Sequence, residues 1–298
     1  MDKVNDLMKK GVSRRTFLAG MGTGVGTAAA MTLAVGCSSY KAPTTTITPK
    51  TGINDADILN FALNLEYLEA EFYLRAVTGS GLSSDDAGPN AGAVTGGAQV
   101  AFQTPAIRQY ATEIANDELL HVRFLRKALG TAAVSRPAID LSGSFNAAAM
   151  AAGIGPAFNP FADENSFVVG AFTFEDVGVT AYHGAAGLIS DKTILSAAAG
   201  ILSTEAYHAA EIRTILAYLG GNFLTYANQI SALRAAAGGG AEVAVSGSTI
   251  VPGDTNSIAF ARTTDQVLHI VYLNGTGVVK SGGFFPNGLN GTITATAS

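Results

Sequence analysis

Apolar residues recur with helical spacing in four long segments, at about 55–77, 105–129, 164–189 and 191–219. In each segment they repeat every three or four residues, which places them on one face of an α-helix. Thr104 precedes the second segment as its N-cap, Pro105 occupies its first position and Gly130 follows it, as expected for the start and stop of a helix. Four long amphipathic helices predict an all-α four-helix bundle.

The segments that connect these helices differ in length. Residues 78–103 form a loop rich in Gly, Ser and Asp, and residues 130–163 form a long crossover that contains three prolines. Only a residue or two around Ser190 separates the third helix from the fourth. A long second crossover allows two helical hairpins to pack side by side.

The C-terminal part of the chain has a different character. A fifth helix is expected at about 222–237, and after Gly238 the sequence is Gly-rich and β-like. One short helix is expected from Thr263 to Leu273, opened by a capping-box pattern. The bundle is therefore expected to carry a Gly-rich, partly β C-terminal extension, to which the sequence assigns no role.

The first 36 residues are typical of a targeting segment and are excluded from the expected fold. Basic residues precede the pair Arg14-Arg15, and a weakly hydrophobic run rich in Gly and Ala follows it from Gly20 to Gly36. The pair resembles a twin-arginine signal, read by the twin-arginine export machinery, whose cargo is usually exported folded. A chance Arg-Arg pair before a short apolar helix is the alternative.

The only cysteine of the chain, Cys37, ends this run in a segment that resembles a bacterial lipobox, with Ala34 where that pattern more often has Leu. The resemblance implies a periplasmic protein that is anchored to a membrane by acylation of Cys37. One cysteine cannot form an internal disulfide. The expected organisation is a signal peptide (1–36), a lipid anchor and linker (37–54), the four-helix bundle (55–220) and the extension (221–298).

Charge narrows the range of partners. The chain has 18 basic and 23 acidic residues, and its first 36 residues contain five of the bases and two of the acids. The remaining 13 bases and 21 acids give a net charge of −8. A domain of this sign offers no basic face to nucleic acid, and metal cations are its more natural partners.

Two Glu-x-x-His motifs, Glu118 to His121 and Glu205 to His208, lie in the second and fourth predicted helices. Residues three apart share a helix face, so each pair can present a carboxylate oxygen and an imidazole nitrogen to one point. The chain has ten Glu and four His, so two such pairs are improbable by chance. The pattern favours a metal site over isolated buried acids.

The first and third predicted helices each supply one glutamate, Glu66 and Glu175, with a tyrosine seven residues later, Tyr73 and Tyr182. Apolar residues surround all four motif glutamates at helical spacing, so their carboxylates should face the core, where an unpaired charge is costly. Lys and Arg are absent from these helix faces, so two divalent ions are expected to balance the four charges. Carboxylate and imidazole ligands suit iron or manganese.

Other polar residues have simpler interpretations. Glu69 is the substitute ligand if the helix register differs. Tyr73 and Tyr182 are expected to hydrogen-bond to ligand carboxylates. His183 and His269 are expected outside the ligand set, and Glu71, Glu113 and Glu211 on solvated helix faces or at their edges. A fold that has kept the six residues but lost its metals is the alternative to a working site.

One Glu, one Glu-x-x-His, one Glu and one Glu-x-x-His in successive helices resemble the ferritin-like superfamily over residues 55–219. Within it, the segments 267–273 and 284–288 resemble the tail of an exported bacterial branch that is related to plant desiccation-associated proteins. The resemblance implies two iron or manganese ions, with Glu118 and Glu205 bridging and Glu66 and Glu175 more terminal.

The resemblance also implies redox chemistry toward dioxygen or peroxide, as in a di-iron oxidase or a manganese-catalase-like dismutase. Whether the chain is an enzyme stays open at this point. Metal sequestration without turnover, or a stress-protective structural role, is the alternative.

Overall fold

The computed structural model describes residues 52–297 of the 298-residue chain. The predicted export signal at Arg14 and Arg15 and the predicted lipidation site at Cys37 lie outside these residues. Between residues 52 and 297, none of the helices has the length and apolar character needed to cross a membrane.

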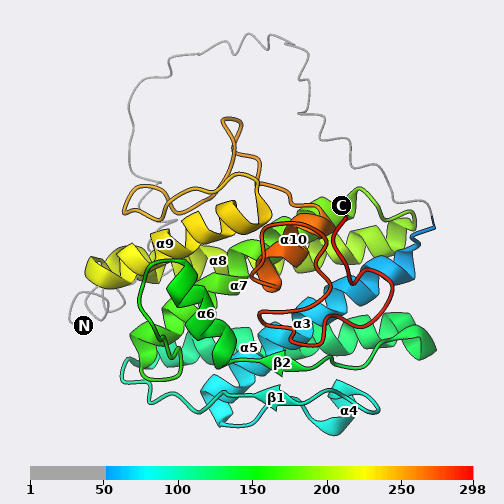
Figure 1. Ribbon diagram of the computed structural model, residues 1–298, viewed down its shortest axis with the longest axis horizontal. Helices are drawn as coiled ribbons and strands as arrows, with labels where there is room; N and C mark the ends of the chain where they lie inside the picture. The colour runs from blue at the N-terminus through cyan, green and yellow to red at the C-terminus, as the bar shows by residue number, and fades with distance from the viewer. Residues whose placement is uncertain (1–51, 298) are drawn as a thin grey trace, which may run out of the picture. The chain divides into compact units, whose positions relative to one another are not determined.

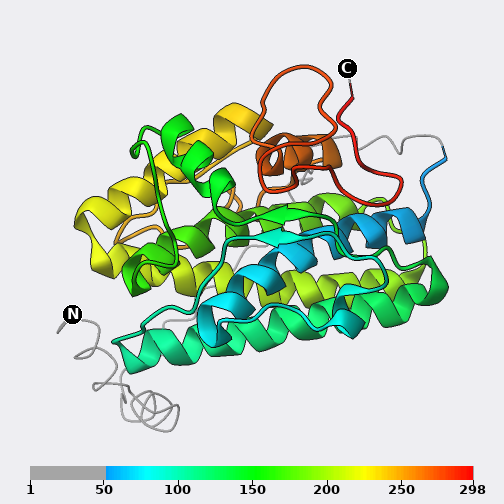
Figure 2. The ribbon, with the colours of Figure 1, turned by 60° about the horizontal axis from the view of Figure 1, so that its bottom comes forward.

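Four long helices form the bundle, in agreement with the predicted all-α fold: α3 (Asp55–Thr78), α5 (Pro105–Leu129), α7 (Glu164–Ala186) and α8 (Lys192–Leu219). Their ends lie within three residues of the predicted ends. Helix α3 packs mainly against α5, and α7 packs mainly against α8. The bundle is therefore built from two helical hairpins, whose four helices run alongside one another in Figure 2.

Short polar contacts fix the helix ends. The side chain of Asn54 accepts a hydrogen bond from the backbone N–H of Asp57, and the Asp57 carboxylate accepts one from Asn54, so α3 begins with a capping box. At the start of α5, Thr104 occupies the predicted cap position but makes no side-chain cap. The Glu164 carboxylate instead accepts the N–H groups of Gln103 and Thr104, both at 2.7 Å. This contact ties α5 to the first residue of α7.

The strands of the two long connections lie side by side along the lower edge of the bundle in Figure 1. They contain the short elements α4 (Ser84–Ala87), β1 (Val94–Thr95), η1 (Gly130–Ala132), β2 (Ile139–Asp140) and α6 (Gly143–Ala151). Strands β1 and β2 pair in parallel, with Val94 opposite Ile139. The crossover is thus held to the earlier loop as well as to the helices.

Glu71 corrects one prediction, because it lies in the interior and not on a solvated face. Its carboxylate pairs with Arg75 at 2.8 Å and with Arg136, and it accepts the N–H of Leu82 at 3.2 Å. An acid of this kind is structural, since it joins α3 to both connecting segments.

The extension packs closely on the bundle. It contains α9 (Gly221–Gly238) and α10 (Thr264–Val271), close to the two predicted helices. The expectation of a partly β tail is wrong for residues 239–297, where only isolated bridges occur. Phe284 packs edge-on against Phe145 and Phe174, and the Asn64 side chain exchanges two hydrogen bonds with the backbone of Asn290. The tail therefore completes the core.

Candidate metal centre

The structure brings the six predicted ligand side chains together inside the bundle. Each of the four long helices contributes, and every one of the six residues is at most 8% exposed. They are Glu66 from α3, Glu118 and His121 from α5, Glu175 from α7, and Glu205 and His208 from α8. Residues that are up to 142 positions apart in sequence thus form one cluster.

The cluster consists of two groups with one member in common. Glu66, Glu118, His121 and Glu205 form the first group, and Glu118, Glu175 and His208 form the second. Within each group the possible ligand atoms all lie within 4.8 Å of one another. Such spacing suits one cation in each group.

The Glu118 carboxylate faces both groups with different oxygens. Its Oε2 lies 3.4 Å from Nδ1 of His121, and its Oε1 lies 3.0 Å from Nδ1 of His208. The same nitrogen of His121 lies 3.1 Å from Glu66 Oε2 and 3.5 Å from Glu205 Oε1. Nδ1 of His208 lies 3.7 Å from Glu175 Oε2. Glu118 is therefore placed to bridge the two groups.

The two tyrosines hold the remaining carboxylates, but each reaches across to the other hairpin. The Tyr73 hydroxyl on α3 donates a hydrogen bond to Glu175 on α7, and the Tyr182 hydroxyl on α7 donates one to Glu66 on α3. The expectation that both tyrosines bond to cluster carboxylates agrees with these contacts. The crossed pairing joins the two hairpins at the site.

His208 has a partner that the sequence did not reveal. Its Nε2 lies 3.2 Å from Oδ2 of Asp117, so one ring nitrogen faces a carboxylate while the other faces the cluster. Histidine ligands of metals commonly donate their second ring nitrogen in this way. Asp117 lies on α5 and His208 on α8, so no sequence spacing marks the pair.

Several buried atoms of the cluster lack a hydrogen-bond partner among the residues that the structure describes. They are both carboxylate oxygens of Glu118 and of Glu205, Oε2 of Glu175 and Nδ1 of His208. Leaving such groups unpaired in the interior is costly. All six atoms are good ligands for a transition-metal ion, so the residues present fit a di-metal site.

The ionisation of the protein groups reflects the same crowding of acids. Burial raises the pKa of Glu66 to about 8, and it also raises the pKa values of Glu175 and Glu205. Burial opposes ionisation of Glu118, but its contacts with the two histidines lower its pKa below the ordinary value. Burial likewise opposes protonation of His208, yet contacts with Glu118 and Glu175 raise its pKa to about 11. Burial therefore favours the protonated forms of Glu66, Glu175 and Glu205, and their ionised forms would need positive charge nearby.

Glu69 lies one turn from Glu66 but outside both groups. It is 6% exposed, and burial together with the nearby acids raises its pKa well above the ordinary value. A Cβ atom on Gly178 would collide with Oε2 of Glu205 and would lie 3.5 Å from Oε1 of Glu69. Glycine at position 178 thus leaves room for both carboxylates.

The other histidines lie outside the cluster, as expected. Nδ1 of His183 faces the backbone oxygen of Phe260 at 3.2 Å, and Nδ1 of His269 faces that of Asn274 at 2.5 Å. Both contacts fix the tail. Glu113 is exposed and Glu211 is half-buried, in agreement with the predicted positions on solvated faces or edges.

Residues 54–218 match the profile of a family described as "Ferritin-like domain". This match covers more than half of the chain, so the protein belongs to the ferritin-like family. The chain is 31% identical over 272 residues to "Ferritin-like catalase Nec2" of Nesocodon mauritianus, with 81% of this chain and 86% of the relative covered.

The chain is also 32% identical over 244 residues to "Desiccation-related protein PCC13-62" of Craterostigma plantagineum, with 72% of this chain and 76% of the relative covered. Both alignments are longer than the family match, so the likeness extends beyond the bundle into the flanking sequence.

Proposed function

We propose that this protein binds two iron or manganese ions and dismutates hydrogen peroxide to water and dioxygen. The observation that carries the proposal is the pair of ligand groups joined through Glu118, in which six buried atoms lack a hydrogen-bond partner within residues 52–297. Similarity to a relative named as a ferritin-like catalase favours peroxide over dioxygen as the substrate.

Each residue of the cluster has a distinct role in this proposal. Glu118 would be shared by the two ions, Glu66, His121 and Glu205 would hold the first, and Glu175 and His208 would hold the second. The two tyrosine hydroxyls hold the carboxylates of Glu66 and Glu175 in place. When bound, two redox-active ions would cycle between oxidation states, so that one peroxide is reduced to water and a second is oxidised to dioxygen. Burial of the cluster excludes bulk water, and Asp117 orients the ring of His208.

Metal analysis and peroxide consumption test this function together. Protein purified from its native compartment should contain about two ions per chain and should release dioxygen from peroxide without an added reductant. Two bound ions with no turnover of peroxide would refute the enzymatic function and leave the site intact. Absence of metal after reconstitution would refute the site itself.

Metal sequestration linked to stress protection is the second candidate function. The relative named as a desiccation-related protein favours it, since that name describes no reaction. Ferrous iron would then be taken up with consumption of dioxygen, and peroxide would not be dismutated. The same oxygen-electrode measurement separates the two candidates.

Export and anchoring remain proposals of their own, supported by Arg14, Arg15 and Cys37 in the sequence. Replacing both arginines by lysine should stop delivery to the periplasm, and Cys37→Ala should release a soluble form. Cell fractionation measures both effects. Unchanged delivery of the double-lysine variant would reject the twin-arginine signal.

A further inference from the structure

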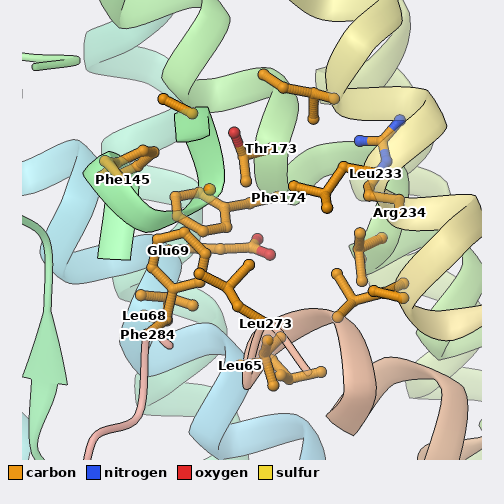
Figure 3. Close-up of a pocket in the computed structure, with 18 of the residues that line it drawn as sticks. Leu65, Leu68, Glu69, Phe145, Thr173, Phe174, Leu233, Arg234, Leu273 and Phe284 are labelled. Carbon is orange, nitrogen blue, oxygen red and sulfur yellow. The ribbon is translucent and has the colours of Figure 1, made fainter. Parts of the chain in front are cut away.

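A cavity of about 40 Å³ lies beside the ligand cluster, enclosed by α3, α6, α7, α9, α10 and the tail. Its walls are almost entirely apolar, and they include Leu65, Phe145, Val177, Ile230, Val271 and Phe284. Figure 3 shows the carboxyl group of Glu69 pointing into the space between these walls.

Glu69 is the one polar side chain of the cavity wall that has no partner among residues 52–297. Thr173 donates to the backbone oxygen of Val169 at 3.4 Å, and Arg234 donates to Asp176, Glu242 and the backbone oxygen of Phe172. Glu69 makes no hydrogen bond within the described chain, although it is only 6% exposed. A carboxyl group in this position needs a hydrogen-bonding occupant.

The cavity adjoins the ligand cluster at Gly178. This glycine lines the cavity, and a Cβ atom there would contact Glu205 and would lie 3.5 Å from Glu69 Oε1. The absent side chain therefore brings an oxygen of the cluster next to the cavity. A molecule that contacts Glu69 in the cavity therefore lies close to the Glu205 carboxylate.

Size and polarity limit what can occupy the cavity. One water needs roughly 10–15 Å³ by this kind of measure, whereas an engineered cavity of about 150 Å³ holds benzene. A volume of 40 Å³ admits a molecule of a few atoms and excludes an organic ring. Apolar walls disfavour ions. The occupant should be small, neutral and able to donate a hydrogen bond.

We propose that this cavity is the holding site through which hydrogen peroxide reaches the ligand cluster, and that Glu69 accepts a hydrogen bond from it. Peroxide has the required size, carries no charge and donates hydrogen bonds, whereas dioxygen cannot donate. This inference rests on the proposed function for its occupant, but the cavity itself can be tested separately.

Filling the cavity from its wall is the first test. Ala237 is half-buried and lines the cavity, while its neighbour Ala236 is exposed and does not. Ala237→Phe should lower kcat/KM for peroxide by about tenfold or more, equivalent to about 1.4 kcal/mol, with metal content unchanged. The matched control Ala236→Phe should keep full activity. Equal activity of the two variants would overturn the route.

The hydrogen bond to Glu69 is tested by a pair of substitutions of similar size. Glu69→Leu removes the acceptor and should raise KM for peroxide up to about tenfold, while Glu69→Gln keeps an acceptor oxygen and should change KM much less. Metal content should stay at the wild-type value in both. Loss of metal, or equal effects of Leu and Gln, would overturn the assigned role.

Xenon provides a readout that does not depend on activity. Crystals of the whole protein under xenon pressure should show xenon in the cavity, and Ala237→Phe should remove it. Failure of wild-type protein to take up xenon overturns the cavity proposal even if peroxide is consumed. Xenon uptake without peroxide consumption overturns peroxide as the occupant, together with the proposed function.

Discussion

Two neighbouring acids on α7, Glu175 and Asp176, are both buried but have opposite surroundings. Oδ2 of Asp176 accepts hydrogen bonds from Arg213 and Arg234, each at 2.8 Å. Glu175 accepts a hydrogen bond from Tyr73 but pairs with no Lys or Arg among the described residues. One oxygen of each acid, Oε2 of Glu175 and Oδ1 of Asp176, has no hydrogen-bond partner there. Successive residues on a helix point about 100° apart, so one helix serves two different interiors.

The arginine side of α7 is neutralised by the protein itself. Glu242 of the tail pairs with Arg234 at 2.9 Å and with Arg262 at 2.7 Å, and Arg213 donates to backbone oxygens in the same segment. We call Asp176, Glu242 and the three arginines the arginine network. It holds the tail that follows α9 against α7, α8 and α9.

The comparison shows how a buried acid can be classified. Where the chain supplies its own cations, as in the arginine network, the acid stabilises the fold by pairing. Where four glutamates meet two histidines and no Lys or Arg, part of the required positive charge must come from outside the chain. The first region should therefore govern stability, and the second should govern metal binding.

Removing the shared ligand should have the largest effect. Glu118→Ala deletes the carboxylate that faces both histidines, so metal content should fall from about two ions per chain to background, with loss of peroxide consumption. Elemental analysis after reconstitution measures the metal content. The exposed Glu113→Ala is the control and should retain both ions; full metal binding by Glu118→Ala would contradict the bridge.

Breaking the arginine network should act on stability alone. Asp176→Ala leaves Arg213 without a carboxylate partner and Arg234 with Glu242 alone, which should lower the free energy of unfolding by about 3–5 kcal/mol. Glu71→Ala, which unpairs Arg136, should behave similarly. Both variants should still bind metal when folded at low temperature. Denaturant titration with metal analysis checks this, and metal loss from folded Asp176→Ala would end the distinction.

The two regions should also differ in their response to pH. In chelator-stripped protein the pKa of Glu66 is raised to about 8 and that of His208 to about 11. A raised pKa means that the folded state holds the proton more tightly, so this stability is present at low pH and is lost as pH rises.

For Glu66 this contribution to the free energy of unfolding, on the order of 5 kcal/mol, should be lost between about pH 4.5 and 8. For His208 the loss should begin above about pH 6.5. Metal-loaded protein should show the reverse trend, since its ligands must release protons to bind. Thermal melts at pH 5.5 and 8 measure both forms. Identical trends would contradict metal binding at these residues.

The tyrosine contacts should give the smallest effect. Tyr182→Phe and Tyr73→Phe each remove one hydrogen bond to a carboxylate, which should cost about 1 kcal/mol of stability and about 10–100-fold in metal affinity. Competition with a chelator measures the affinity. Because the pairing is crossed, Tyr182→Phe should weaken the Glu66 side, and combining it with Glu66→Gln should add little further loss.

Much of the fold could be read from local patterns. The helix ends lie where glycine, proline and capping side chains put them, because these act through neighbouring backbone groups. The prediction of a partly β tail is wrong, because a Gly-rich sequence without strand pairing partners forms loops. The solvated position of Glu71 was also wrong, because its partner Arg136 is 65 residues away.

The sequence by itself determined the six residues that meet in the cluster, because helical spacing fixes which side chains share a face and buried acids without basic neighbours stand out in the pattern. Only the tertiary structure decided that the tyrosines cross between hairpins and that Asp117 supports His208. It also decided that Arg213, Arg234 and Arg262 hold the tail, and that Glu69 faces a cavity. These contacts join separate helices, and their geometry depends on how the hairpins pack, which no single helix encodes.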